Sequence, residues 1–343
     1  MKAPKIHRLR PSEQFARGVL IAALALVSSA PLTASALKKI TSIELPGPAG
    51  KRFDYLTIDP ATHRLFVAHM GAGNVYVVDV ETNKVLNTVA NVPGVEGVTF
   101  VAELQKLYTS DWGEDTIGVV DLRSMQILTK IPTESKPDGS AYAGPFGKLY
   151  VSDERARAVA VVDVKRDMVV KMLRFKSETG MSQYDPVAKK VYVNLQDSNE
   201  FAVIDPANDA LAGRYPVGRC QGNHGMALDP ADHRAFLSCE GNSLLTIFNL
   251  DTFAPIEYLK MAPGADVVAY DAGLGRVYVA CYSGAISVFE RKDADHFQKL
   301  ADVNVAHAVH SLAIDPSTHR VYVPEQEEDG MPVSRLVVYE AVH

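Results

Sequence analysis

Imidazole and carboxylate side chains gather at one repeated position of this sequence. Seven aromatic residues, from Phe66 to Tyr322, recur along the chain at nearly constant spacing. The residues twelve positions before these aromatics are Asp54, Glu96, Asp138, Gly180, His224, Asp266 and His310. Imidazole combined with carboxylate suits Zn²⁺, Mn²⁺ and related metals, whereas carboxylates alone suit Ca²⁺. The same two groups can exchange protons with a substrate as general acid and general base.

A second set of candidate residues follows the same aromatics. Three positions after them the sequence has His69, Asp111, Asp153, Leu195, Cys239, Cys281 and Glu325. One position further, two of the repeats carry Trp112 and Tyr282. Aromatic rings beside charged groups can stack on a sugar, a base or a peptide, and the alternative is that Trp112 is wedged between two structural units.

The metal hypothesis concerns His224, Asp266 and His310, which would share one divalent ion. They occupy the same position in three successive repeats, and the other repeats have no histidine there. No short-spaced histidine pair and no EF-hand loop supports a metal. The alternative is that these positions are polar because strand ends at a water-filled channel are solvated.

The three cysteines allow one disulfide at most and leave at least one free thiol. Cys239 and Cys281 occupy equivalent positions of successive repeats, so we predict a Cys239–Cys281 bridge that joins two neighbouring units. Cys220 would then be the free thiol. The alternative is a reactive thiolate beside His224.

The spacing of the aromatic residues indicates which elements carry these side chains. Phe66, Tyr108, Tyr150, Tyr192, Phe236, Tyr278 and Tyr322 lie 42 to 44 residues apart, and each is followed by a polar marker, Asp79, Asp121, Asp163, Asp205, Asn249, Glu290 or Glu340. The intervening segments alternate with period two and are separated by Asp-Pro and Gly turns, which is typical of strands. The pattern predicts an all-β, seven-bladed β-propeller of four-stranded blades.

In such a blade the first strand begins at the earlier polar position, and the second strand runs back to the same face. We therefore expect both residue sets to surround one mouth of a central channel and to form a ligand-binding site there. The opposite mouth would carry the Asp-Pro turns.

The segments LFVAH, LYVSD, VYVNL and VYVAC, followed by strands of the VVD type, resemble the YVTN-repeat β-propeller family of secreted and surface proteins. The resemblance covers Lys38 to His343. Related propellers include lactonases, dehydrogenase subunits and a DNA-binding protein, so the resemblance implies the fold and leaves the function open.

The last repeat, residues 310–343, contains only three strand segments. Ile40–Leu45 has the character of a fourth strand, so we predict that the N-terminal strand completes the seventh blade and closes the ring. Closure removes two exposed sheet edges, which would otherwise promote aggregation. Residues 37–343 would form a single domain.

Residues 1–36 are predicted to be a cleaved signal peptide. Basic residues precede the apolar run Gly18–Ala30, and Ala34, Ser35 and Ala36 supply a small-residue cleavage site. The alternative is a buried N-terminal helix. Because the apolar run is too short to span a bilayer, we expect a periplasmic or secreted protein with no membrane span after cleavage.

The processed chain would be acidic. The full chain has a formal net charge of −6. The predicted signal peptide carries five basic residues and one acidic residue, a net charge of +4, so residues 37–343 have a net charge of −10. Binding to nucleic acid depends on clustered Lys and Arg, so DNA binding is disfavoured. No covalent haem motif, P-loop, GxGxxG or GxSxG motif is present.

We therefore expect a monomeric, exported propeller that binds a small molecule or a protein partner at the channel mouth, with one divalent metal ion as the only cofactor considered. The alternative is a lactonase-like hydrolase, in which a metal or a carboxylate–imidazole pair would activate water. An enzyme would need His224, Asp266 and His310 to converge on one point.

Overall fold

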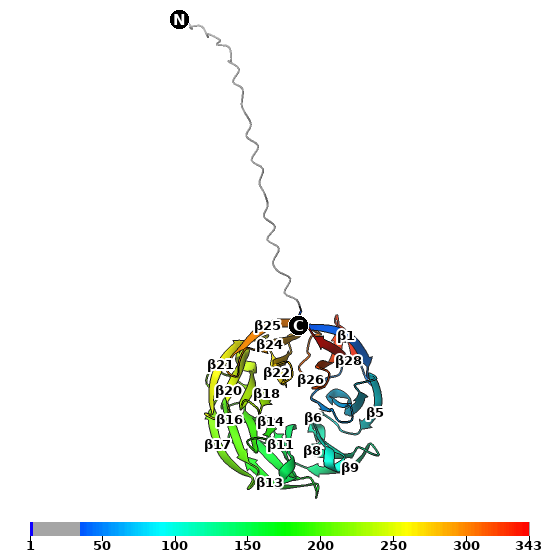
Figure 1. The fold of residues 1–343 in the computed structure, drawn as a ribbon. Coiled ribbons are helices and arrows are strands. Elements are labelled where there is room, and N and C mark those ends of the chain that lie inside the picture. The colour runs from blue at the N-terminus through cyan, green and yellow to red at the C-terminus, as the bar shows by residue number, and fades with distance from the viewer. Residues whose placement is uncertain (3–34, 343) are drawn as a thin grey trace. The chain divides into compact units, whose positions relative to one another are not determined.

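The chain forms seven antiparallel four-stranded sheets arranged as blades around a common axis (Figure 1). The computed structural model describes residues 1–2 and 35–342. Blade one consists of β2 Leu56–Asp59, β3 Arg64–His69, β4 Asn74–Asp79 and β5 Lys84–Ala90, and blade two of β6 Val95–Val101, β7 Lys106–Asp111, β8 Thr116–Asp121 and β9 Gln126–Pro132. Blade three consists of β10 Pro137–Ala143, β11 Lys148–Asp153, β12 Ala158–Asp163 and β13 Met168–Arg174, and blade four of β14 Thr179–Asp185, β15 Lys190–Leu195, β16 Glu200–Asp205 and β17 Ala210–Pro216. In each blade the first-named strand lies innermost.

Blades five to seven repeat this arrangement. Blade five consists of β18 Asn223–Asp229, β19 Arg234–Cys239, β20 Leu244–Asn249 and β21 Ala254–Lys260. Blade six consists of β22 Ala265–Asp271, β23 Arg276–Cys281, β24 Ala285–Arg291 and β25 Phe297–Asn304. Blade seven consists of β26 Ala313–Ile314, β27 Arg320–Glu328, β28 Met331–Ala341 and β1 Leu37–Glu44. Five single-turn 3₁₀ helices join strands: η1 Met70–Ala72, η2 Ala102–Leu104, η3 Trp112–Glu114, η4 Gly144–Phe146 and η5 Glu240–Asn242. The predicted all-β, seven-bladed propeller of four-stranded blades is confirmed.

The seven aromatic residues that set the repeat are all buried between blades, with at most 1% of their surface exposed. Two of them also bond across to the next blade. The hydroxyl of Tyr108 donates to Asp167 at 2.6 Å, and that of Tyr150 donates to Asp209 at 2.6 Å. Lys106 and Lys148 form ion pairs with the same two carboxylates at 2.6 Å. The aromatic position therefore holds neighbouring blades together by packing and, in these blades, by hydrogen bonding.

The N-terminal strand completes the seventh blade, as predicted. β1 pairs antiparallel with β28 along its length, from Leu37 opposite Ala341 to Glu44 opposite Arg335. The strand begins three residues earlier than the predicted Ile40–Leu45, and a register shift between Lys39 and Thr41 separates its two paired halves. The ring is thus closed by hydrogen bonds between the two ends of the domain.

The predicted signal peptide falls largely on residues 3–34, which lie outside the described residues. From Ser35 onward the described chain belongs to one compact unit. Within the described residues, no helix has the length and apolar character needed to cross a bilayer.

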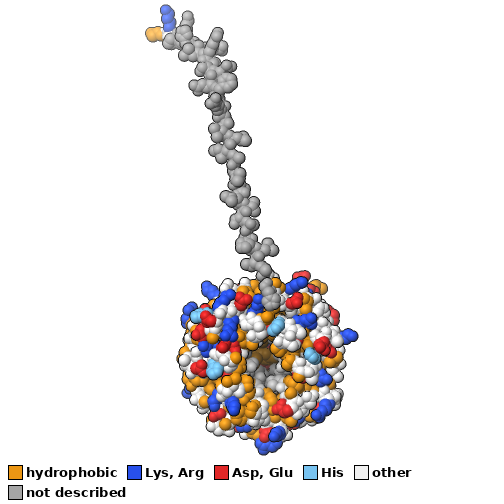
Figure 2. All heavy atoms as spheres, in the orientation of Figure 1, with side chains coloured by type: hydrophobic (Ala, Val, Ile, Leu, Met, Phe, Trp, Pro, Cys, Tyr) orange, Lys and Arg blue, Asp and Glu red, His pale blue; other side chains and the backbone are white. Residues whose placement is uncertain are grey.

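The inner strands enclose a central channel, and Figure 2 shows a hollow at the centre of one face of the ring with hydrophobic side chains inside it. One cavity of about 260 Å³ is bounded by β2, β6, β10 and β14, and a second of about 390 Å³ by β2, β14, β18, β22 and β26. Tyr55, Met181 and Gln183 line both cavities. The channel interior therefore carries both apolar and polar groups.

Replacing Ile43 by Ala should destabilise the domain much more than replacing Ile40 by Ala. Ile43 is 6% exposed and packs in a cluster with Phe53, Tyr322 and Leu336, whereas Ile40 of the same strand is 37% exposed. We expect a loss of about 2–5 kcal/mol for the buried position and less than about 0.5 kcal/mol for the exposed one, measured by denaturant unfolding. Equal losses would show that β1 does not pack into the closing blade.

Candidate functional site

The position twelve residues before each aromatic lies where the inner strands begin, and we call these seven residues the polar ring. It comprises Asp54, Glu96, Asp138, Gly180, His224, Asp266 and His310. In β6, β10, β14, β18 and β22 the pairing register shifts at this point, so that the ring residue is not paired with the second strand. Such an irregularity changes the direction of a side chain, and here it lets the ring residues leave the regular alternation of the sheet.

Neighbouring blades approach closely at the polar ring, and glycine makes this possible. A Cβ atom on Gly97 would lie 2.3 Å from the carbonyl oxygen of Asp138, and one on Gly225 would lie 2.0 Å from that of Asp266. Any larger residue there would push the blades apart. The dipeptides Glu96-Gly97 and His224-Gly225 were therefore a signal for the ring that the sequence interpretation did not use.

His224 forms the tightest contact of the ring. Its Nδ1 lies 2.7 Å from Asp266 of the next blade, and its Nε2 lies 4.0 Å from Asp138, two blades away in the other direction. Burial alone would lower the pKa of His224, but the Asp266 and Asp138 carboxylates outweigh it and raise that pKa. Burial would raise the pKa of Asp266, and His224, His310 and Arg52 together reverse this and lower it. Both shifts favour the charged forms, an imidazolium beside a carboxylate.

His310 is held by a different set of neighbours. Its ring stacks on Tyr282 with 4.4 Å between centroids, and its Nδ1 lies 2.9 Å from the carbonyl oxygen of Ala308. The Nε2 atom is buried without a hydrogen-bond partner and lies 3.7 Å from Asp54. Burial would lower the pKa of His310, but Asp54 and Asp266 outweigh it and raise that pKa.

Arg52 joins this side of the ring from the segment before the first blade. Its guanidinium lies 2.9 Å from the Asp54 carboxylate and 5.8 Å from the centre of the Tyr282 ring. The charged half of the ring thus combines one guanidinium, two imidazoles and an aromatic face. Arg52 lies two positions before the ring residue Asp54, so counting twelve positions back from each aromatic did not identify it.

The opposite half of the ring is acidic. One oxygen each of Glu96, Asp138 and Glu154 lie within 4.8 Å of one another. Burial, with Asp138 and Asp54, raises the pKa of Glu96, and burial also raises the pKa of Asp138. Glu154 forms an ion pair with Lys136. Glu154 lies in the turn after β11 and was missed because it follows a predicted position by one residue.

Tyr55 places a hydroxyl group in the centre of this arrangement. Tyr55 is 6% exposed, and its hydroxyl oxygen is buried without a hydrogen-bond partner. Burial raises its pKa, and so do the carboxylates of Asp138, Asp266, Asp54 and Glu96. These carboxylates come from four different blades, and Tyr55 lines both channel cavities, so its side chain faces the channel.

The predicted metal trio is not brought together. His224 and Asp266 are in contact, but His310 does not join them within ligand distance, because its neighbours are Asp54 and Tyr282. Among the described residues, the group whose potential ligand atoms do converge is Glu96, Asp138 and Glu154. The ligand atoms of His224, Asp266 and His310 therefore do not converge on one point among the described residues, and a metal shared by them stays a prediction.

The second predicted set does not line the channel mouth. His69, Asp111 and Asp153 have no exposed surface, and Glu325 has 3%. They lie on second strands, one strand outward from the channel, where side chains stand perpendicular to the sheet and face neighbouring blades. The structure encloses these side chains between blades, and their role in ligand binding stays a prediction.

Each of these four side chains is enclosed by its own surroundings. His69 stacks on Phe53 at 4.0 Å, and Glu325 accepts a hydrogen bond from Arg335 at 2.6 Å. Asp153 accepts a hydrogen bond from the backbone N–H of Glu134 at 3.2 Å. Burial raises the pKa of Asp111 to about 7. These residues contribute to blade packing rather than to the ring.

Tyr282 lies beside a ring residue, and Trp112 lies beside two cations near the ring. Tyr282 covers His310 as described, and Trp112 stands beside two cations, with Lys136 Nζ at 5.5 Å and the Arg155 guanidinium at 5.0 Å from its ring centre. Since Lys136 also pairs with Glu154, Trp112 adjoins the acidic half of the ring. The two aromatics thus flank the two halves of the site.

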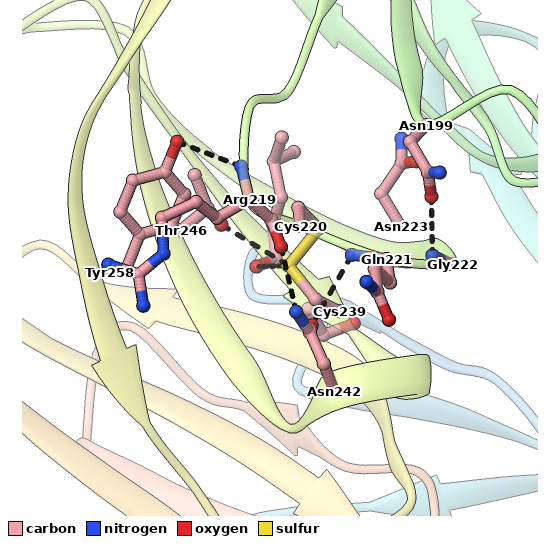
Figure 3. Close-up of a disulfide and its surroundings, with 12 residues drawn as sticks. Asn199, Arg219, Cys220, Gln221, Gly222, Asn223, Cys239, Asn242, Thr246 and Tyr258 are labelled. Carbon is pink, nitrogen blue, oxygen red and sulfur yellow. Dashed lines mark hydrogen bonds between the residues drawn. A yellow bond between two sulfur atoms is a disulfide. The ribbon is translucent and has the colours of Figure 1, made fainter.

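The disulfide joins Cys220 to Cys239, so the predicted Cys239–Cys281 pairing is wrong (Figure 3). Pairing of β18 with β19 sets Asn223 opposite Cys239, which brings the preceding loop with Cys220 to a Cα distance of 5.2 Å. Cys239 lies on β19 of blade five and Cys281 on β23 of blade six, and Cys281 stays unpaired.

Cys281 is the free cysteine and is buried. Burial raises the pKa of its thiol to about 12, so it is protonated at neutral pH. With the other two cysteines oxidised, the reactive thiolate considered beside His224 is contradicted.

Solved structures share this fold across most of the chain. The WD40 repeats of RRP9 match with a TM-score of 0.74 and 12% identity over 89% of this chain and 98% of that chain. U3-55K matches with a TM-score of 0.74 and 12% identity over 88% of this chain and 98% of that chain. The hydrazine synthase of Kuenenia stuttgartiensis matches with a TM-score of 0.73 and 16% identity over 89% of this chain and 99% of that chain. Similarity at such identities shows the fold alone.

No family model and no curated protein sequence matches this chain. The structural matches bear out the β-propeller and do not distinguish between propeller families. The resemblance to the YVTN-repeat family therefore stays a prediction.

Thiol titration distinguishes the two cysteine pairings. The unfolded, unreduced protein should show one thiol, and Cys281→Ser should show none, because the remaining cysteines are joined. Cys220→Ser should release Cys239 and show two thiols. A variant lacking Cys220 with no free thiol would instead support the Cys239–Cys281 pairing.

Proposed function

We propose that this protein is an exported β-propeller that binds a small polar ligand at the polar ring. The observation that carries the proposal is a set of three buried polar atoms without hydrogen-bond partners, which belong to Tyr55, Glu96 and His310. Leaving such an atom unsatisfied costs about 1–3 kcal/mol. The three atoms belong to three blades around one axis, so a ligand that forms hydrogen bonds with all of them would be stabilised at this site.

The charges of the site define the ligand further. Five carboxylates, Asp54, Glu96, Asp138, Glu154 and Asp266, face two permanent cations, Arg52 and Lys136, and two imidazoles. When all five carboxylates are ionised, they exceed the cations even with both imidazoles protonated, and a bound cation would favour the ionised forms of Glu96 and Asp138, whose pKa values burial raises. A small polar molecule with a cationic or hydroxyl-rich group therefore complements the acidic half, and the flanking rings of Tyr282 and Trp112 supply aromatic surface for its apolar part.

A hydrolase of the lactonase kind has less support. A general base must be unprotonated when it accepts a proton from water, and the Asp266 and Asp138 carboxylates keep His224 protonated by raising its pKa. His310 is likewise shifted toward its charged form by Asp54. In their protonated forms, both imidazoles can donate hydrogen bonds to a ligand but cannot accept a proton from water.

A thermal-shift screen of residues 37–343 against amines, amino acids, polyols and sugars tests ligand binding. A ligand at 100 times its dissociation constant stabilises the folded state by about 2.7 kcal/mol. We expect at least one of these classes to raise the unfolding temperature of the wild type. The shift should be lost in Tyr55→Phe, which removes the central hydroxyl group.

Tyr184→Phe is the matched control for this screen. Tyr184 also lines the 260 Å³ cavity, and its hydroxyl oxygen is also buried without a partner, but it lies near the opposite end of its inner strand from the ring. The control should keep the full shift. No shift with any class, or an equal loss in both variants, would contradict binding at the polar ring.

Export is supported by the leader pattern of residues 1–36 and by the Cys220–Cys239 disulfide, since such bonds persist in oxidising compartments. Expression of the full chain in a bacterium should yield protein outside the cytoplasm whose N-terminal residue is Leu37. A chain that begins at Leu37 should stay in the cytoplasm. N-terminal sequencing of fractionated cells checks this, and an uncleaved cytoplasmic protein from the full chain would contradict export.

A further inference from the structure

We infer that Glu96, Asp138 and Glu154 form a binding site for a hard divalent cation, with Ca²⁺ as the preferred ion. The inference deepens the proposed function, on which its biological role rests, because the cation would lie in the polar ring and could contact the ligand directly. The three residues come from β6, β10 and the turn after β11, so the ion would bridge blades two and three.

The distances between the carboxylates suit one shared ion. Ca²⁺–oxygen bonds are about 2.3–2.6 Å long, so two oxygens bound to the same ion can lie at most about 5 Å apart. One oxygen from each of the three residues lies within 4.8 Å of the other two. An ion between them therefore needs little movement of the side chains.

The surroundings of Glu96 supply a second, independent observation. Glu96 is 2% exposed, and its Oε2 atom is buried without a hydrogen-bond partner. No Lys, Arg or His of the described chain lies within ion-pair distance of this carboxylate, although other buried acids of the protein have such a partner, as Glu325 does in Arg335. A bound cation would supply the missing partner.

The charge of the cluster matches a divalent ion. The three carboxylates carry three negative charges when ionised, and Lys136 neutralises one of them through its ion pair with Glu154. Lys136 is held in place from the other side by the Trp112 ring at 5.5 Å. The two remaining negative charges equal the charge of one divalent cation, and the His224 imidazolium, whose Nε2 lies 4.0 Å from Asp138, pairs more closely with Asp266 at 2.7 Å.

The donor atoms decide which ion is preferred. All three ligands are carboxylates. The imidazole of His224 contacts Asp266 through Nδ1 at 2.7 Å, and its Nε2 lies 4.0 Å from Asp138. Oxygen donors suit Ca²⁺, Mg²⁺ and Mn²⁺ rather than Zn²⁺. Ca²⁺ accepts irregular arrangements of carboxylates, whereas Mg²⁺ requires a near-octahedral set at shorter distances. A cluster built from two blades and a turn therefore favours Ca²⁺.

Isothermal titration calorimetry of chelator-treated, dialysed protein with CaCl₂ tests the inference. We expect one Ca²⁺ per chain, with weaker binding of Mg²⁺. Glu96→Gln and Asp138→Asn keep the side-chain shape and remove the charge, and each should weaken Ca²⁺ binding by at least about tenfold, since even changes outside the ligand set cost about 10–100-fold in metal affinity.

Asp111→Asn is the matched control. Asp111 is a buried carboxylate of blade two whose two oxygens also lack partners, but it is not part of the converging group. This variant should bind Ca²⁺ like the wild type. Thermal unfolding followed by circular dichroism gives a second measurement, because Ca²⁺ should raise the unfolding temperature of the wild type and of Asp111→Asn but not that of Glu96→Gln.

No heat and no stabilisation of the wild type by Ca²⁺, Mg²⁺ or Mn²⁺ would overturn the inference, as would unchanged binding in Glu96→Gln. The ligand screen, repeated with EDTA and with Glu96→Gln, separates this failure from failure of the proposed function. Ligand stabilisation that persists without any cation would leave the polar ring as a ligand site and remove only the metal from it.

Discussion

The candidate site depends on the way the inner strands begin. At the ring position the strand leaves its regular pairing, and the next residue allows the backbone of the following blade to approach, as Gly97 does for Asp138. The two effects together release a polar side chain from the sheet and bring it near the side chains of other blades. The contact of His224 with Asp138 across the intervening blade four shows the result.

This arrangement is costly for folding and therefore informative about function. Buried carboxylates are favourable only when cations or hydrogen bonds compensate them, and several ring groups lack such partners. The interfaces between blades, which bury the repeated aromatics, supply the stability that the ring does not. A polar ring that contributes little to stability is consistent with a role in binding.

The sequence predicts the fold almost completely because the propeller depends on local and periodic features. The anchor aromatics repeat every 42 to 44 residues, and the missing fourth strand of the last repeat led directly to the closing β1. The ring position was also found by counting. Counting gives the position of a residue along its strand and not the direction of its side chain, so it did not predict that His69 stacks on Phe53.

Other parts of the site depend on contacts that have no period. The disulfide is formed by a loop residue, Cys220, whereas the repeat pattern favours two equivalent positions of neighbouring blades. Glu154, Arg52 and Lys136 lie in connecting segments that differ from blade to blade. Repeats identify what the blades share, so a functional residue that occurs in only one connection cannot be predicted from the repeat.

The asymmetry of the ring indicates how it could hold one guest. Blade four contributes Gly180, and this missing side chain lies between Asp138 and His224, which approach each other to 4.0 Å across the gap. Blades five to seven and the segment before blade one supply His224, His310 and Arg52, whereas blades two and three supply the acidic group. A seven-fold repeated ring would present the same group in every direction, but this ring presents positive charge on one side and negative charge on the other. Such polarity fixes the orientation of a bound molecule, which a solvated channel mouth has no need to do.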